Sequence, residues 1–260
     1  MTDAAGPTAD VAARLRSAGS VFAEDEARLL VEAAANAAEL TLLIGRRVAG
    51  EPIEYILGWA EFCGLHIGVR PGVFVPRRRT EFLVERATAL GPESRHPLVV
   101  DVCCGSGAIG AALATRLPGM RLFATDIDAT AVACASENLH GVGVVLHGDL
   151  FAPLPADLRG RVDLIVANAP YVPTSDISLM PREARLYETL STLDGGSDGL
   201  NLHRRISVEA HDWLVPGGHL LLETSERQAE RTARIVAEAG LDARISRSEE
   251  FDATVVTGTR

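Results

Sequence analysis

The 260-residue sequence contains no lysine, so all twenty-five of its positively charged side chains are arginines. There is no side-chain amine to form a Schiff base with a carbonyl substrate, and the lysine of a P-loop is missing. Thirty-five carboxylates outnumber the arginines, which gives a formal charge of −10. Because non-specific nucleic-acid binding depends on neutralising phosphates with positive side chains, this balance argues against a general nucleic-acid coat protein. The net charge does not speak against a local cluster of arginines on one part of the surface.

Aromatic residues, cysteines and long apolar runs are also scarce. Aromatics make up 5% of the chain against 47% hydrophobic residues, which predicts a core of aliphatic side chains and alanine. No run of about eighteen apolar residues occurs, so no membrane span is expected, and the first residues lack the apolar segment of a signal peptide. The four cysteines form no CxxC pair, which indicates neither a disulfide framework nor a zinc site. We therefore expect a reduced, cytoplasmic protein without a bound metal.

The first part of the chain has a helical pattern. Apolar residues recur at spacings of three and four over 25–48, the period of an amphipathic helix, and the Gly-Glu-Pro segment at 50–52 ends it. Glycines then divide residues 55–75 into short apolar stretches, which predicts a β-hairpin. Thr80 can cap a further helix that begins at Glu81.

From His96 onward, apolar strand candidates alternate with helical patterns. The expected strands are 98–102, 122–125, 142–146, 162–167, 219–223, 243–248 and 253–257. The expected helices are 108–116, 130–139, 200–213 and 226–239. This alternation predicts an α/β fold with a mostly parallel sheet covered on both faces. The short connection between the last two strands makes one of them antiparallel.

A glycine-rich turn follows the strand expected at 98–102. The segment Gly105-Ser106-Gly107-Ala108-Ile109-Gly110 matches the fingerprint G-x-G-x-x-G, and Asp126 follows about twenty residues later, as that fingerprint requires. Glycines let the backbone approach a ligand closely, and the start of the next helix offers free N–H donors. We expect a nucleoside site in which Asp126 accepts hydrogen bonds from ribose hydroxyls. The loop alone leaves open whether the ligand is a dinucleotide or S-adenosylmethionine (SAM).

Aspartates also follow the next two strands. Asp128 is placed to cap the helix expected at 130–139. Asp149 can accept a hydrogen bond from an adenine amino group, with Leu150 against the ring face; the alternative is another N-cap or an ordinary turn aspartate.

The segment Asn168-Ala169-Pro170-Tyr171 stands at the carboxyl end of the strand expected at 162–167, where ligands bind in such folds. A buried asparagine is costly without partners, and it carries both an acceptor and a donor. Pro170 favours an extended Ala169, which directs the Ala169 carbonyl beside the Asn168 side chain. Two acceptors so placed can bind both N–H groups of a planar –NH₂ group, and Tyr171 can cover its face.

The chain resembles the HemK/PrmC family of protein-(glutamine-N5) methyltransferases over nearly its whole length. The segments that carry the resemblance, in chain order, are Gly-Glu-Pro-Ile-Glu-Tyr-Ile-Leu-Gly at 50–58, Glu-Phe at 61–62, Pro-Gly-Val-Phe-Val-Pro-Arg at 71–77, Thr-Glu at 80–81, the glycine loop with Asp101, Ala-Thr-Asp at 124–126, Gly-Asp-Leu-Phe at 148–151, Asn-Ala-Pro-Tyr at 168–171, Leu-Asp-Gly-Gly-Ser-Asp-Gly-Leu at 193–200 and Pro-Gly-Gly at 216–218. Their common order is stronger evidence than any single match.

The resemblance implies a seven-stranded, Rossmann-like class I SAM-dependent methyltransferase domain at 80–260, a helical substrate-recognition domain at 1–52 and a β-hairpin linker at 53–79. It implies methyl transfer to the side-chain amide of a glutamine in a protein, with S-adenosylhomocysteine as product. The family's usual substrates are release factors, which present a Gly-Gly-Gln segment. The implied cofactor contacts are Cys103, Cys104, Gly105, Ser106, Gly107, Asp126, Asp149, Leu150 and Asn168. The implied substrate contacts are Asn168, Ala169, Pro170 and Tyr171. We expect a monomer that does not bind nucleic acid stably.

Two departures from the family pattern stand out. The usual Asn-Pro-Pro-Tyr is Asn-Ala-Pro-Tyr here, which keeps the backbone acceptor at Ala169 but loses one rigid proline, and we expect activity to survive. Cys103 stands for the first glycine of the cofactor loop, and Cys104 for a threonine or similar residue. Activated thiolates need a positive partner, and the sequence offers none nearby, so both cysteines are expected to be packed small side chains.

Further residues are candidates for substrate contact. Arg77-Arg78-Arg79 is either a solvated turn or a contact to an acidic or RNA-associated substrate. The long polar connection at 174–197 suggests a substrate-facing loop, in which Glu183 and Arg185 are candidates. The histidines lack metal-ligand spacing and are expected to be surface or packing residues.

Three other functions stay open from the residues alone. A nucleic-acid methyltransferase acting on an exocyclic amino group would need the same –NH₂ recognition, although the negative charge and the absence of lysine disfavour it. A dinucleotide-dependent oxidoreductase would explain the glycine loop but not the segment at 168–171. A catalytically inactive binding module would explain the altered motif.

Overall fold

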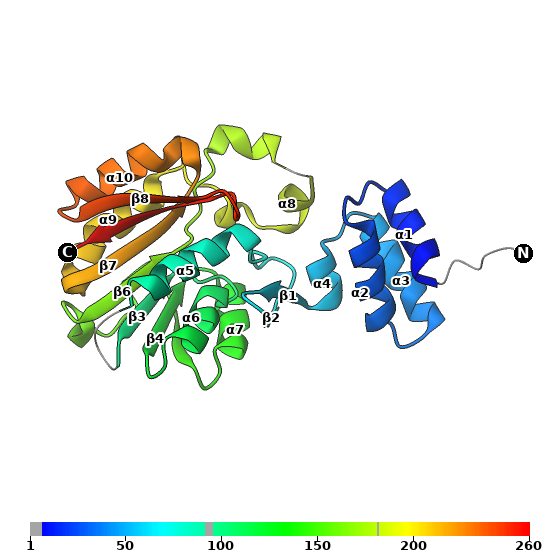
Figure 1. Cartoon of the computed structure of the whole chain (residues 1–260), viewed down its shortest axis with the longest axis horizontal. Helices are drawn as coiled ribbons and strands as arrows, with labels where there is room; N and C mark the ends of the chain where they lie inside the picture. The colour runs from blue at the N-terminus through cyan, green and yellow to red at the C-terminus, as the bar shows by residue number, and fades with distance from the viewer. Residues whose placement is uncertain (1–6, 92–95, 181) are drawn as a thin grey trace, which may run out of the picture.

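A seven-stranded sheet and a group of helices near the N-terminus make up the computed structural model, which describes residues 7–91, 96–180 and 182–260. Figure 1 shows the N-terminal helices set to one side of the sheet and joined to it through a short hairpin. These helices are α1 (Pro7–Ser17), α2 (Ala23–Ala33) and α3 (Ala37–Val48). They pack around their own buried aliphatic residues, among them Leu15 and Leu30.

The prediction of a single helix over 25–48 is wrong, because Ala34 adopts an extended backbone (φ −77°, ψ 123°) and ends α2. The Asn36 side chain then accepts a hydrogen bond from the Glu39 N–H at 3.0 Å, and the Glu39 carboxylate accepts one from the Ala35 N–H at 2.8 Å. These contacts form an N-terminal cap for α3. In the sequence, such a cap is indicated by an asparagine followed three residues later by a glutamate. The apolar periodicity continues through this position, so the pattern gave no sign that one helix ends there and another begins.

A short helix and a two-stranded hairpin follow, namely α4 (Ile53–Leu57), β1 (Trp59–Phe62) and β2 (Leu65–Gly68). The predicted hairpin is confirmed over 59–68. The strand expected from Tyr55 is wrong, because residues 53–57 are helical. Gly58 ends this helix in the left-handed conformation (φ 80°), and its N–H donates to the Glu54 carbonyl at 2.8 Å.

The large sheet has the strand order β5-β4-β3-β6-β7-β9-β8. Its strands are β3 (Leu98–Val102), β4 (Arg121–Asp126), β5 (Gly143–His147), β6 (Val162–Ala167), β7 (Leu214–Thr224), β8 (Asp242–Ser248) and β9 (Ala253–Thr259). Neighbouring strands from β5 to β7 are parallel, and β9 is antiparallel to both β7 and β8. The predicted mostly parallel sheet, with one antiparallel strand among the last two, is confirmed.

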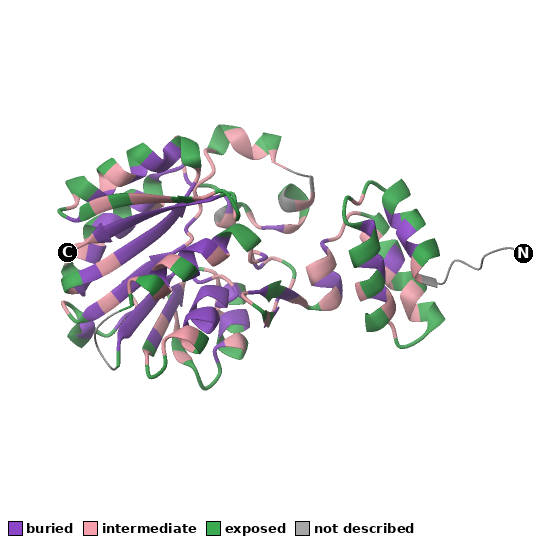
Figure 2. Ribbon diagram, viewed as in Figure 1, coloured by how far each residue is buried: buried purple, intermediate pink, exposed green. Residues whose placement is uncertain are grey.

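Helices cover both faces of this sheet (Figure 1). They are α5 (Glu81–Ala89), α6 (Ala108–Arg116) and α7 (Ala129–Asn138) on one face, and α9 (Asn201–Trp213) and α10 (Ala229–Glu238) on the other. In β3, Val99 packs with the first group and Val100 with the second, and both are 0% exposed. Burial on both faces explains why the strands read as continuous apolar runs, and Figure 2 shows the central strands buried along their length.

Short helical segments occupy the loops. They are η1 (Arg78–Thr80), η2 (Ala156–Leu158), η3 (Thr174–Leu179), α8 (Arg182–Tyr187), η4 (Leu190–Thr192) and η5 (Glu226–Gln228). Three of them lie in the long connection that follows β6. Among the described residues, no helix is both long and apolar enough to cross a membrane.

Candidate active site

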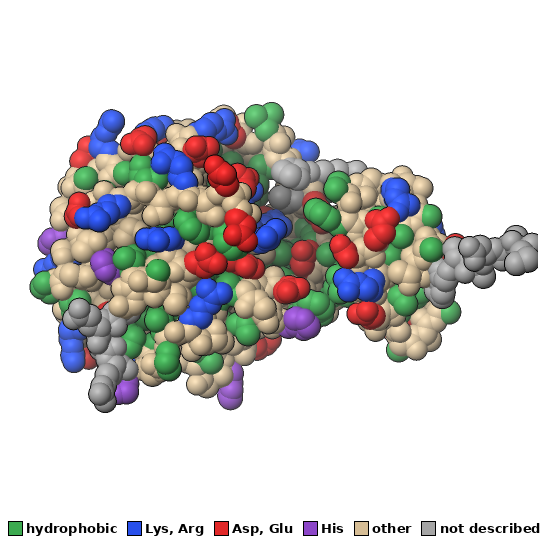
Figure 3. All heavy atoms as spheres, in the orientation of Figure 1, with side chains coloured by type: hydrophobic (Ala, Val, Ile, Leu, Met, Phe, Trp, Pro, Cys, Tyr) green, Lys and Arg blue, Asp and Glu red, His purple; other side chains and the backbone are tan. Residues whose placement is uncertain are grey.

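A cavity of about 1210 Å³ lies at the carboxyl ends of β3, β4 and β6. The strand order reverses there, since β4 lies on one side of β3 and β6 on the other, and ligands bind at such a point in α/β sheets. On the surface, Figure 3 shows a hollow between the body of the sheet and the N-terminal helices, with acidic and arginine side chains around it. The predicted site residues that line the cavity are Cys103, Cys104, Gly105, Ser106, Asp126, Asp149, Leu150, Asn168, Ala169, Pro170 and Tyr171.

The turn between β3 and α6 depends on its glycines. Gly105 has φ 55°, and a Cβ there would project into open space, so the glycine leaves room above the loop. Gly107 has φ 78° and does not line the cavity, because a Cβ on it would lie 3.0 Å from the Leu139 side chain. Gly107 therefore allows α6 to start close to the end of α7. Cys103 also has a positive φ of 57°, which suits the glycine that the family pattern places there.

Asp126 ends β4 with both carboxylate oxygens held by backbone donors. Its Oδ2 accepts from the Gly105 N–H and its Oδ1 from the Asp128 N–H, each at 2.9 Å. Each oxygen has a further lone pair, so the carboxylate can also accept from hydroxyls in the cavity. Burial raises the pKa of Asp126, and the two backbone donors oppose that rise.

Asp128 caps α7 as predicted, because its side chain accepts from the N–H groups of Thr130 and Ala131.

Asp149 and Leu150 face the cavity from the loop after β5. Leu150 is 5% exposed and has φ 47°, a conformation that a leucine keeps only where its surroundings impose it. Arg205 on α9 donates to Asp149 Oδ2 at 2.6 Å and also lines the cavity. This pair leaves Asp149 Oδ1 for a ligand. The sequence did not indicate Arg205, because the pair joins positions 56 residues apart.

Cys103 and Cys104 lie at the cavity as packed thiols. Burial raises the pKa of both thiols, and the carboxylates of Asp101 and Asp126 raise it further. The thiols therefore stay protonated near neutral pH, which agrees with the prediction that neither is a nucleophile.

Asn168 leaves β6 with its amide nitrogen anchored. Its Nδ2 donates to Thr80 Oγ1 at 3.1 Å, and Thr80 is 3% exposed. The prediction that Thr80 caps the helix after it is wrong, since its side chain makes no capping hydrogen bond and contacts Asn168 instead. With the nitrogen held in this way, Oδ1 is the end of the Asn168 amide that is left for a ligand, beside the backbone of Ala169.

Tyr171 is fixed at both its hydroxyl and its backbone. Its hydroxyl donates to Glu223 Oε1 at 3.2 Å, and its carbonyl accepts from Gln228 Nε2 at 2.9 Å. Burial raises the pKa of Tyr171, and Glu223 adds to the rise, so the phenol is neutral. Glu223, near the end of β7, lines the cavity and is 2% exposed. Sequence reasoning missed Glu223, although a polar residue that ends an apolar strand is the signal that identified Asn168.

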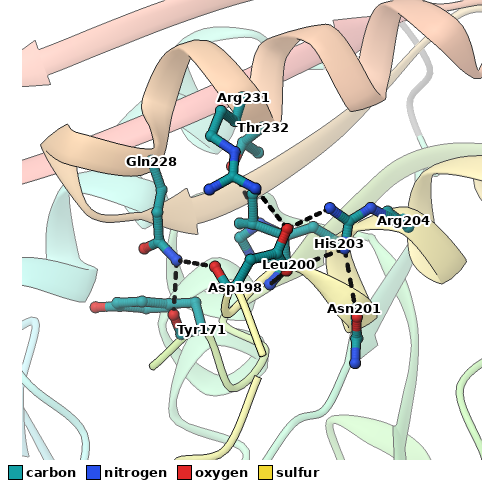
Figure 4. Close-up of polar contacts among 9 residues, drawn as sticks. All are labelled: Tyr171, Asp198, Leu200, Asn201, His203, Arg204, Gln228, Arg231 and Thr232. Carbon is teal, nitrogen blue, oxygen red and sulfur yellow. Dashed lines mark hydrogen bonds and ion pairs between the residues drawn. The ribbon is translucent and has the colours of Figure 1, made fainter. Parts of the chain in front are cut away.

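The glycine-rich segment at 193–200 supports Tyr171 from behind (Figure 4). Gln228 Nε2 bridges the carbonyls of Tyr171 at 2.9 Å and Asp198 at 3.1 Å. The Asp198 carboxylate pairs with arginines on α9 and α10, which fastens the segment to both helices. A Cβ on Gly199 would lie 2.3 Å from the Tyr171 carbonyl oxygen, so only glycine fits there.

The arginines at 77–79 line the cavity, and Arg78 and Arg79 are exposed there, so the structure fits both a solvated turn and a contact to substrate. Arg77 pairs with Glu188, whose side chain is 2% exposed. The Arg78 guanidinium lies over the Phe251 ring, 5.8 Å from its centroid. The Arg79 charge acts on Glu223 and lowers its pKa, against the larger effect of burial.

Of the two predicted contact residues after β6, Glu183 lines the cavity and Arg185 does not. Glu183 pairs with Arg47 of α3 at 3.4 Å, and Arg47 makes a two-point pair with Glu26 of α2. Arg185 donates to the Met180 carbonyl at 3.0 Å. Glu183 therefore links the connection after β6 to the N-terminal helices.

His203 is a packing residue behind Tyr171. It is 0% exposed, its ring centroid lies 6.4 Å from that of Tyr171, and its Nδ1 is 3.2 Å from Thr232 Oγ1. Burial lowers the pKa of His203 to about 4, so the imidazole is neutral. Within the described residues, no group of three or more His, Cys, Asp or Glu side chains is arranged to hold a metal ion.

Comparisons with known proteins agree with this geometry. A family model described as "Methyltransferase small domain" matches residues 65–195. The chain is 36% identical over 253 residues to a release factor glutamine methyltransferase of Bradyrhizobium diazoefficiens, a match that covers 89% of this chain and 85% of that protein. It is 42% identical over 201 residues to the protein of that name in Geobacter sulfurreducens, covering 76% and 69% of the two chains. The chain belongs to the release factor glutamine methyltransferase family.

Solved structures support the fold of this methyltransferase. A methyltransferase from Pyrococcus furiosus superposes with a TM-score of 0.56 at 16% identity, covering 83% of this chain and 96% of that one. A ribosomal protein L11 methylase from Lactobacillus delbrueckii gives a TM-score of 0.53 at 18% identity, covering 75% and 84%. These likenesses show a class I methyltransferase fold.

The methyltransferase uses SAM as its methyl donor, and the cavity residues fit this cofactor. Gly105 leaves open space at the start of α6, Asp126 offers carboxylate oxygens for the ribose hydroxyls, and Leu150 offers an apolar surface for a base. The glycine loop alone was compatible with either a dinucleotide or SAM as ligand. Membership of the methyltransferase family identifies the ligand as SAM.

Proposed function

We propose that this methyltransferase acts on the side-chain amide nitrogen (N5) of a glutamine in a release factor. The observation that carries the proposal is the anchoring of Asn168 by its nitrogen on Thr80 at 3.1 Å. The Asn168 Oδ1 and the Ala169 carbonyl then offer two acceptors, which match the two N–H groups of a primary amide. The names of the relatives point to the same substrate.

The proposed mechanism relies on positioning. A glutamine amide nitrogen is a weak nucleophile because its lone pair is delocalised into the carbonyl. Asn168 and Ala169 accept its two N–H groups and aim the nitrogen at the methyl donor. The same two oxygens stabilise the positive charge that develops on the nitrogen, and neutral Tyr171 covers the face of the amide. Bound SAM would supply an electrophilic methyl group on a sulfonium, with S-adenosylhomocysteine as the leaving group, and the methylated amide would lose one N–H proton to solvent after transfer.

We also propose that residues 1–52, with the linker at 53–79, recognise the protein substrate, and that 80–260 carries the methyl-transfer site. Val21 and Phe22 are 85% and 68% exposed in the N-terminal part, which is apolar surface that a protein partner can cover. The charge of −10 without any lysine favours a protein over a nucleic acid as substrate. All the side chains and backbone groups assigned to cofactor and substrate binding come from one chain, so a monomer is sufficient for activity.

Asn168→Ala tests the amide site. We expect kcat/KM for a purified release factor to fall about 100-fold or more, because one acceptor of the transition state is lost, while calorimetry shows SAM affinity within about threefold of the wild type. Asn201→Ala, at an asparagine that also lines the cavity, is the matched control and should keep most of the activity.

Full activity of Asn168→Ala would show that the amide is bound elsewhere. Parallel reactions of the wild-type enzyme with labelled SAM and stripped RNA or DNA test the alternative substrate. Label in nucleic acid, with none in the release factor, would replace the proposed function.

A further inference from the structure

One side chain, Asn138, joins the β1–β2 hairpin to the glycine loop. Asn138 is the last residue of α7, which lies beside β2 (Figure 1), and it is half-buried. Its Nδ2 donates to the carbonyls of Gly68 in β2 and of Ser106 in the loop, each at 2.8 Å, and its Oδ1 accepts from the Gly68 N–H at 2.9 Å. Ser106 lines the cavity, whereas Asn138 and Gly68 do not. The contacts therefore connect the hairpin to the cavity wall from outside the cavity.

The three backbone groups allow the Asn138 amide one orientation. A backbone N–H only donates, and a carbonyl only accepts. The Gly68 N–H therefore requires the amide oxygen, and the carbonyls of Gly68 and Ser106 require the two N–H groups of the amide nitrogen. An aspartate of the same shape would turn an acceptor oxygen toward both carbonyls.

The Ser106 carbonyl depends on Asn138 because of the way α6 begins. In a regular helix this carbonyl would accept from the N–H four residues later, which belongs to Gly110. The Gly110 N–H donates to Asp101 Oδ2 at 3.0 Å. The Ser106 carbonyl accepts from a neighbouring helix, through Asn138.

The peptide group between Ser106 and Gly107 is held at both ends. Its N–H, on Gly107, donates to the Cys104 carbonyl at 2.7 Å, and its carbonyl, on Ser106, accepts from Asn138. Gly105 and Gly107 both have positive φ, and glycines leave the backbone free to adopt other conformations when contacts are lost. Without Asn138, this part of the loop would have to be ordered again each time a ligand binds, which costs affinity.

We propose that Asn138 is a positioning residue for the cofactor site, and that it makes SAM affinity depend on the placement of the hairpin. It acts through the Ser106 carbonyl and lies outside the cavity, so it touches neither cofactor nor substrate. The N-terminal helices are joined to the sheet through the same hairpin (Figure 1), so a change in hairpin position reaches the cofactor loop. The inference concerns the cofactor alone and goes beyond the proposed function.

Calorimetry with SAM and the full chain tests the role of Asn138. We expect Asn138→Ala to raise the Kd for SAM about tenfold, because the Ser106 carbonyl loses its partner. Asn138→Asp should weaken binding at least as much, since its oxygen opposes both carbonyls. In methylation assays the KM for SAM should rise in both variants, while kcat at saturating SAM stays within about threefold of the wild type.

Glu137→Gln is the matched control. Glu137 precedes Asn138 on α7 and pairs with Arg70, just after β2. Its substitution removes another contact between α7 and the chain after the hairpin but leaves Ser106 untouched. SAM affinity should stay within about twofold of the wild type.

Gly68→Ala tests the connection to the hairpin. Gly68 has an extended backbone in β2 that alanine also adopts, but a Cβ there would lie 3.0 Å from Asn138 Oδ1 and press on this side chain. We expect the Kd for SAM to rise about threefold or more, although Gly68 does not line the cavity. In the Asn138→Ala background the same substitution should have no further effect, because the side chain that the new Cβ would meet is gone.

The outcomes that overturn the inference are specific. A Kd for SAM within about twofold of the wild type in Asn138→Ala or Asn138→Asp, or an equal loss in Glu137→Gln, rejects the positioning role. Losses that multiply in the double variant reject the connection to Gly68. Should Asn138→Ala fail to fold, Gly68→Ala decides, because unchanged SAM affinity in that variant overturns the proposal.

The calorimetry contains no protein substrate, so its result is separate from the proposed function. A wild-type enzyme that binds SAM but leaves the release factor unmodified would reject the proposed function and would leave the role of Asn138 to be decided by the affinities.

Discussion

Asp101 shows how burial sets the charge of single residues at this site. It is 0% exposed at the centre of β3, where its Oδ2 accepts from the Gly110 N–H at 3.0 Å and its Oδ1 is buried without a hydrogen-bond partner in the described chain. Burial raises the pKa of Asp101 to about 7, the Gly110 N–H opposes the rise, and the charge of Asp126 adds to it. Asp101 therefore changes charge close to neutral pH, at the base of the glycine loop.

The raised pKa of Asp101 predicts a pH-dependent effect of Asp101→Asn on stability. The folded state binds the Asp101 proton more tightly than the unfolded chain does. Asp101 therefore costs stability as the pH rises from about 4 through about 7. An asparagine stays neutral and can still accept from Gly110. Thermal unfolding at two pH values checks this. We expect the difference in Tm between the variant and the wild type to be several degrees larger at pH 8 than at pH 5, at roughly 2–4 °C per kcal/mol. A difference that is constant or that decreases with pH would contradict this account.

At the scale of elements, the site forms where strands end. The sequence predicted β3 and β6 to the residue, because a fully buried parallel strand is a continuous apolar run that stops at a glycine turn or an asparagine. Asn168 could be predicted for the same reason. Thr80 and Glu223 could not be placed, because η1 and β7 bring them to the site from positions 88 residues from Asn168 and 52 from Tyr171. Contacts of that range depend on how the elements pack, which a local pattern does not contain.

Alanine substitution should affect activity at Gly199, in the segment at 193–200, but not at Gly160, a glycine elsewhere in the chain. Gly199 and Gly160 both have positive φ, of 78° and 70°, but a Cβ would meet the Tyr171 carbonyl at 2.3 Å in the first case and nothing within 4 Å in the second. Both alanine variants should lose about 1 kcal/mol from the strained backbone. We expect only Gly199→Ala to displace Tyr171 and to lower kcat at least about tenfold. Steady-state kinetics with Tm measured in parallel checks this, and equal kcat in the two variants would show that the segment does not position Tyr171.

At the scale of the whole molecule, the cavity joins parts of the chain that are far apart in sequence. Its lining extends from Phe62 in the hairpin to Phe251 before β9 and includes the connection after β6. The pair between Glu183 and Arg47 ties that connection to the N-terminal helices. Glu183 lines the cavity and pairs with Arg47, so the N-terminal helices contact the cavity wall through this ion pair.

This arrangement predicts that Phe22→Asp affects a folded substrate and not a short one. Phe22 is 68% exposed, so its loss should leave stability nearly unchanged. We expect the KM for the complete release factor to rise roughly tenfold, about 1.4 kcal/mol, with no change for a short peptide that contains Gly-Gly-Gln. Val208→Asp, at a residue 66% exposed on α9, is the matched control. An equal effect of both variants, or an effect on the peptide, would contradict recognition by the N-terminal helices.

The most direct test of the central claim is mass spectrometry of a release factor after incubation with SAM and the wild-type enzyme, with fragmentation that locates the modified atom. We predict one added methyl group on the side-chain amide of the glutamine in Gly-Gly-Gln. We also predict no modification when that glutamine is replaced by glutamate, and modification at least about 100-fold slower when Asn168→Ala replaces the wild type. A methyl group on any other residue, or an unmodified release factor beside methylated nucleic acid, would contradict it.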